Sequence, residues 1–66
     1  MRLSVNGRSH ELPEGSVLTG LVAALVPDHR GIAVAVNGSV VRAGEWPDTS
    51  LRDGDHVEVV TAHQGG

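Results

Sequence analysis

The side chains of this sequence offer little covalent chemistry, which directs attention to its two final residues, Gly65 and Gly66. The 66 residues include no cysteine and no lysine, so the chain has neither a thiolate nucleophile nor an amine for a Schiff base. Its four histidines are not spaced as metal ligands. Pairs of acidic residues suited to acid–base work are expected only as surface charges, outside any pocket. The carboxylate of Gly66 is the group that remains, and we expect the chain to bind no cofactor or metal.

Two glycines suit a chain end that must enter a closed active site. Without a Cβ, Gly65 and Gly66 can pass a narrow channel and adopt conformations closed to other residues. Residues 63–66, fully extended, span about 13 Å and would hold the carboxylate clear of a globular body. We expect His63, Gln64 and Gly65 to contact a partner enzyme there. The alternative is that the two glycines are merely an untidy terminus.

Composition excludes several classes of partner. The net charge is −3 with a pI of about 5.7, and Trp46 is the only aromatic residue. Nucleic acid is therefore not an expected ligand, because phosphate contacts and base stacking both lack their usual residues. No apolar run is long enough to span a bilayer, and the N-terminus does not resemble a signal peptide. We expect a cytoplasmic monomer that does not bind membranes.

The first half of the chain predicts a hairpin and a helix. Residues 2–6 alternate polar and apolar, Asn6-Gly7 is typical of a tight turn, and residues 8–12 return as a second strand. Ser16 is a candidate helix N-cap, and Pro27 ends the helix. Between them one apolar stripe recurs at helical spacing: Val17, Leu18, Leu21, Val22, Leu25 and Val26.

The second half predicts three more strands. Residues 32–36 read as a buried strand, Asn37-Gly38 as a second hairpin turn, and residues 40–42 as a short strand. A turn-rich stretch, 43–55, precedes a last strand over 56–62. This order predicts an α+β fold, the ubiquitin-like β-grasp, with a mixed four- to five-stranded sheet packed on one helix. Residues 1–62 would form the domain and residues 63–66 a flexible tail.

One face of the predicted sheet is a candidate docking surface. If Val57 and Val59 face the helix, Glu58, Val60 and Ala62 face away from it. Ala33 and Ala35 share that outer face if their strand is a neighbour of the last strand. Small apolar residues that remain exposed on a sheet face are typical of a surface that binds a partner protein. The alternative is a scatter of single exposed residues.

Three other features have two interpretations each. His63 would contact the partner enzyme or simply be solvated in the tail. Glu58, Asp53 and Asp55 would steer a basic partner or simply belong to a solvated turn. We expect Trp46 to cover the edge of a small core rather than to bind a ligand.

Several short motifs are distributed along the chain: Asn37-Gly38, Val40-Val41-Arg42, Glu45-Trp46, Leu51-Arg52-Asp53-Gly54-Asp55 and Gly65-Gly66. Together they resemble the ThiS family of ubiquitin-like sulfur carriers in thiamine biosynthesis, and the resemblance covers the whole chain. Departures from the family's pattern are minor, namely Gly20 within the helix and His63-Gln64 before the glycines.

The resemblance implies a carrier acted on by enzymes rather than an enzyme. A ThiF-like adenylating enzyme would use Mg-ATP to convert the Gly66 carboxylate to an acyl-adenylate. A persulfide sulfur donor would displace AMP to leave a thiocarboxylate, and a ThiG-like thiazole synthase would take the sulfur. Alternatives are a carrier of the molybdopterin synthase small-subunit type, a ubiquitin-like protein modifier, and a regulatory β-grasp module without chemistry.

Overall fold

A five-stranded sheet and one α-helix form the core of the chain, within the residues that the computed structural model describes, 1–26 and 31–61. The elements, in chain order, are β1 (Arg2–Val5), β2 (Arg8–Glu11), α1 (Leu18–Leu25), β3 (Ile32–Val36), β4 (Ser39–Val41), the 3₁₀ helix η1 (Ala43–Asp48) and β5 (His56–Thr61). No helix in these ranges combines the length and apolar character needed to cross a bilayer.

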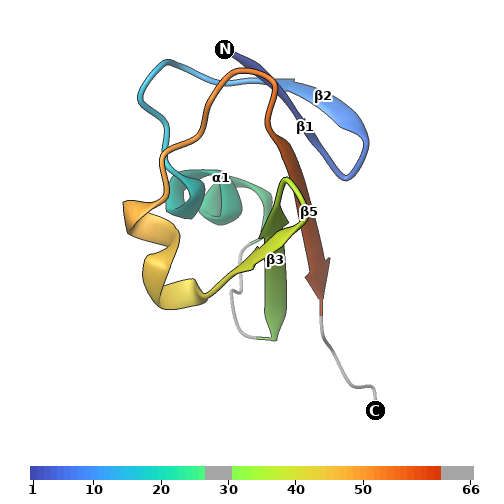
Figure 1. Cartoon of the computed structure of the whole chain (residues 1–66), viewed down its shortest axis with the longest axis vertical. Coiled ribbons are helices and arrows are strands. Elements are labelled where there is room, and N and C mark those ends of the chain that lie inside the picture. The colour runs from blue at the N-terminus through green and yellow to red at the C-terminus, as the bar shows by residue number, and fades with distance from the viewer. Residues whose placement is uncertain (27–30, 62–66) are drawn as a thin grey trace.

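The last strand occupies the middle of the sheet. The strand order is β2-β1-β5-β3-β4, with β5 parallel to β1 and antiparallel to β3. The helix α1 lies on one side of this sheet, and β5 runs from the end of the molecule that holds the N-terminus to the opposite end (Figure 1). The predicted mixed sheet on one helix is thereby confirmed, with five strands.

Both Asn-Gly pairs form the tight turns that the sequence predicts. Asn6 and Asn37 each have φ of 52°, and Gly7 and Gly38 have φ of 83° and 86°. Two consecutive residues with positive φ match the right-handed twist of the flanking strands, which is why Asn-Gly is favoured there. These turns fix the register of both hairpins, and that register decides which side chains share a face.

The core lies between α1 and the inner face of the sheet. The helix contributes Leu18, Leu21 and Val22, all buried. Burial of each such side chain stabilises the fold by about 1.5–3 kcal/mol, which offsets the helix-weakening effect of Gly20. The sheet and the segment after it add the remaining buried residues of the same cluster: Leu3, Val5, Val34, Trp46, Leu51 and Val57.

Trp46 belongs to this core rather than to its edge. Its side chain is 4% exposed, and its indole Nε1 donates a hydrogen bond to the Val41 carbonyl at 2.9 Å. The predicted packing role is right, but the residue comes from η1, a helical turn where the sequence predicts only irregular turns.

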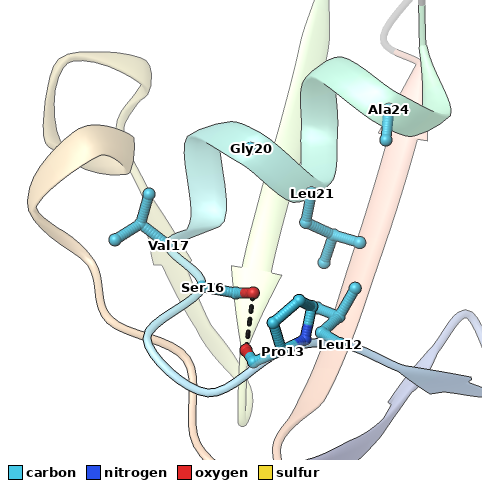
Figure 2. A pocket seen from close by; sticks show the side chains of 7 residues that line it. All are labelled: Leu12, Pro13, Ser16, Val17, Gly20, Leu21 and Ala24. Atoms are coloured by element: carbon cyan, nitrogen blue, oxygen red, sulfur yellow. Dashed lines mark hydrogen bonds between the residues drawn. The ribbon is translucent and has the colours of Figure 1, made fainter.

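The prediction that Ser16 caps the helix is wrong. The helix begins at Leu18 after an extended Val17, and the Ser16 hydroxyl donates instead to the Pro13 carbonyl at 2.8 Å (Figure 2). A distant segment takes over the capping role, because the Leu18 N–H donates to the Thr49 carbonyl at 2.9 Å. Tertiary pairing thus satisfies a helix N–H that a local side chain was expected to satisfy.

Candidate functional site

The predicted docking residues lie on the face of the sheet turned away from the helix. In the β3–β5 pairing, Ala33 lies opposite Val60 and Ala35 opposite Glu58. Directly opposed residues of two strands project from the same face. Val34, next to both alanines, is 1% exposed on the helix side, so the alternation along β3 is unambiguous. The structure therefore brings all four described residues of this prediction together.

Val40 enlarges this face and was not among the predicted site residues. It lies opposite Ala35 across the β3–β4 hairpin and is 76% exposed, and Val60 is 57% exposed. The two-residue turn at Asn37-Gly38 dictates this register, so counting outward from the turn would have found Val40. We refer to Ala33, Ala35, Val40, Glu58 and Val60 as the outer patch.

The outer patch lies close in sequence to the predicted tail. Val60 is followed by Thr61, the last described residue, and Ala62 separates Thr61 from the predicted tail, residues 63–66. The predicted contact residues Ala62, His63, Gln64 and Gly65 and the reactive Gly66 lie outside the described residues. The boundary that the sequence predicts between residues 62 and 63 lies outside them as well. The roles of these residues stay predictions.

Asn6 holds the strand that carries the tail. Its side-chain Oδ1 accepts a hydrogen bond from the Val59 N–H at 2.9 Å, and its Nδ2 donates to the Val59 carbonyl at 3.1 Å. The side-chain amide therefore continues the ladder of β1 past the end of that strand, at Val5. The sequence placed Asn6 at the end of the first strand and in the turn that follows. It could not show this contact, because the contact joins residues 53 positions apart.

The two aspartates before β5 stabilise a turn. Asp55 accepts from the Asn37 Nδ2 at 3.0 Å through Oδ1 and from the Arg52 N–H at 2.8 Å through Oδ2. Asp53 Oδ1 accepts from the Arg2 N–H at 2.6 Å. Of the two interpretations, this geometry favours the structural turn for both residues. Glu58 is exposed in the outer patch, where its carboxylate is available for contact with a partner protein.

The described histidines lie apart from one another. His10 is half-buried on β2, and the His56 Nδ1 lies 2.8 Å from the Ser4 hydroxyl on the outer face. In the part of the chain that the structure describes, no three acidic or histidine side chains are arranged to hold a metal ion. Among the described residues, the candidate site is therefore the outer patch.

Comparison with known proteins points in one direction. The family model described as the ThiS family matches residues 3–66, which include both final glycines. The sulfur carrier protein ThiS of Thermus thermophilus is 40% identical over 62 residues, covering 94% of this chain and 95% of that protein. A thiazole synthase of Magnetococcus marinus is 33% identical over all 66 residues, a match that spans 20% of its own length.

Solved structures agree with these sequence matches. The crystal structure of the thiamine biosynthesis protein ThiS from Geobacter metallireducens superposes with a TM-score of 0.86 at 33% identity, and each chain is covered completely. A solution structure of a thiamine biosynthesis protein from the same organism gives a TM-score of 0.80 and is covered to 88%. The likeness thus includes the strands that build the outer patch.

Proposed function

The chain belongs to the ThiS family, and on that premise we propose that it carries sulfur for the thiazole moiety of thiamine on the carboxylate of Gly66. The observation that supports this most directly is the extent of the family match, which runs to residue 66 and so includes the Gly65-Gly66 pair. The protein is a co-substrate on which partner enzymes act, and it supplies no catalytic side chain of its own.

The proposed cycle begins with activation of the tail. A Gly66 carboxylate oxygen attacks the α-phosphorus of ATP and expels pyrophosphate, which gives an acyl-adenylate. The partner adenylating enzyme would supply Mg²⁺ and cationic groups to stabilise the charge on the transferring phosphate. The terminal sulfur of a persulfide then attacks the acyl carbon, AMP leaves, and an acyl disulfide forms. A thiol cleaves the S–S bond that came from the persulfide, which releases the thiocarboxylate and leaves a disulfide between the thiol and the donor.

The outer patch would be the surface that partner enzymes bind while the tail lies in their active sites. Ala33 and Ala35 have short side chains, so the middle of the patch, on β3, protrudes little. Val40 on β4 and Val60 on β5 project at its two sides. Such a shallow, largely apolar surface favours binding of another protein over binding of a small molecule.

The partners we propose are a ThiF-like adenylating enzyme, a persulfide donor and a ThiG-like thiazole synthase. The Magnetococcus relative supports the last of these, since its thiazole synthase contains a segment that resembles this whole chain. We place the cycle in the cytoplasm, where ATP for the first step is available.

Intact-mass measurement tests this proposal. The purified protein is incubated with ATP, the host's adenylating enzyme and a persulfide donor. We expect a mass gain equal to the replacement of one oxygen by sulfur, and no gain in a variant that lacks Gly66. An unchanged mass would refute the carrier function, and covalent adducts with other proteins would indicate a protein modifier instead.

A further inference from the structure

We propose that a groove on the helix side of the sheet receives an acidic and apolar segment of the adenylating enzyme, an inference that rests on the proposed function. The groove has a volume of about 440 Å³ and is bordered by β1, β2, β5 and the end of α1. Its lining includes Arg8, His10, Leu25, Val59 and Thr61. We call it the basic groove.

The floor of the basic groove is apolar because the helix is too short to cover the whole inner face. α1 ends at Leu25, whose side chain is 39% exposed, and Val26 follows in an extended conformation. Val5 and Val59 lie on the helix side of the sheet and also line the groove. A partner's apolar side chain would remove this surface from water, which favours binding.

The rim of the groove is basic. Arg8 lies opposite Val5, and His10 lies opposite Leu3. Val5 and Leu3 belong to the core on the helix side of the sheet. Arg8 and His10 therefore project on the helix side as well. No acidic residue is found among the described residues that line the groove, although the chain carries a net charge of −3.

Arg8 has no carboxylate partner in the part of the chain that the structure describes. The ion pairs found there join the Met1 amine to Glu14 and Arg2 to Glu11. A guanidinium can form a two-pronged hydrogen-bonded pair with a carboxylate, and this geometry is among the stronger polar contacts in proteins. Charge complementarity therefore predicts an aspartate or glutamate in the occupant, beside the apolar side chain that fills the floor.

The position of the groove connects it with the tail. Thr61 lines the groove and lies two residues before the predicted tail, which begins at His63. Asn6, whose amide holds Val59, lines it too. The outer patch covers the other side of the same strand. An enzyme that occupied both surfaces would hold the end of β5 from two sides.

Binding to both sides of β5 would suit the adenylating enzyme in particular. Its reaction requires the carboxylate to lie in line with the phosphorus of a bound nucleotide, and small errors of placement slow such a step greatly. A small inorganic anion would satisfy Arg8 but leave the apolar floor empty, so a protein segment accounts for more of the groove.

Binding of charge variants tests the inference. The dissociation constant for the host's adenylating enzyme is measured without ATP, by titration calorimetry, for the wild type, Arg8→Glu and Arg52→Glu. Arg52 is exposed and lies outside the groove, so its variant has the same net charge and serves as the matched control. We expect Arg8→Glu to weaken binding about tenfold or more, and Arg52→Glu to change it less than about twofold. Arg8→Lys should recover part of the loss.

Each result separates the inference from the proposed function. If the wild type gains no thiocarboxylate, the proposed function fails and the inference fails with it. If the wild type gains it but Arg8→Glu binds the adenylating enzyme as Arg52→Glu does, the inference alone is refuted. A loss seen with thiazole synthase and not with the adenylating enzyme would also refute it. Melting of Arg8→Glu, followed by Trp46 fluorescence, excludes unfolding as the cause; should it unfold, Arg8→Gln replaces it in the same comparison.

Discussion

Replacing Asn6 by glycine removes the amide that holds Val59 and leaves the turn conformation accessible. Asn6 has φ of 52°, which glycine adopts without strain. The change therefore removes the two hydrogen bonds of 2.9 and 3.1 Å between the Asn6 side chain and the Val59 backbone without straining the turn. Alanine would be a poorer choice, because its Cβ adds strain at positive φ.

The expected loss of stability follows from these two bonds. A hydrogen bond within a protein contributes about 0.5–1.5 kcal/mol net, and exposed bonds fall toward the lower part of that range because water replaces the lost partner. We therefore expect Asn6→Gly to lower the free energy of unfolding by about 1–2 kcal/mol. In a domain of this size that corresponds to a fall in melting temperature of about 4–16 °C.

The assay combines a global with a local measurement. Fluorescence of Trp46, the single tryptophan, follows thermal unfolding. Hydrogen exchange then reports on the Val59 amide itself, which we expect to exchange much faster in Asn6→Gly. Asn6→Asp is the matched control, since it keeps the oxygen that accepts from the Val59 N–H and loses the donor, and it should fall between wild type and Asn6→Gly. An unchanged melting temperature together with an unchanged Val59 exchange rate would refute the role given to this amide.

Three further substitutions test other parts of the structure. Gly20→Ala should raise the free energy of unfolding by about 1 kcal/mol in a urea titration, since an added Cβ at this helix position meets no atom within 4 Å; destabilisation would contradict that open space. Trp46→Phe should lower it by about 1–2 kcal/mol by circular dichroism, because the Val41 carbonyl loses its indole donor; no change would show that water replaces that bond freely. Val60→Asp should leave stability within about 0.5 kcal/mol, as expected at an exposed position, yet weaken binding to the adenylating enzyme about tenfold. Ala23→Asp, on the exposed surface of α1, is its control, and equal binding by both variants would exclude the outer patch as the docking surface.

Local patterns were sufficient to predict most of the fold. The strand over residues 32–36 has the predicted bounds, and the two Asn-Gly turns have the predicted positive φ values. Alternation along two neighbouring strands also predicted that Ala33 and Ala35 share a face with Glu58 and Val60. These features depend on side-chain period and turn chemistry, which a single sequence displays directly.

What the sequence did not reveal depends on contacts between distant residues. Ser16 has the chemistry of an N-cap, but pairing with the segment around Thr49 decided where the helix begins. The hydrogen bonds between Asn6 and Val59, and the basic groove, could be predicted only if β1 and β5 were known to be neighbours. The reactive end could be predicted, because glycine at positions 65 and 66 needs no tertiary information to be noticed.

The parallel pairing of β1 with β5 also bears on how the molecule is made. Ser4 and His56, paired across these strands, are 52 positions apart, so the hairpins β1–β2 and β3–β4 have no common neighbour until β5 is available. On a ribosome the nascent chain cannot complete its sheet until translation has passed Thr61, and contacts this distant in sequence also slow folding. A chain terminated early would lack the centre of its sheet and remain open to proteases. Synthesis itself would thus limit the folded population to molecules translated through β5.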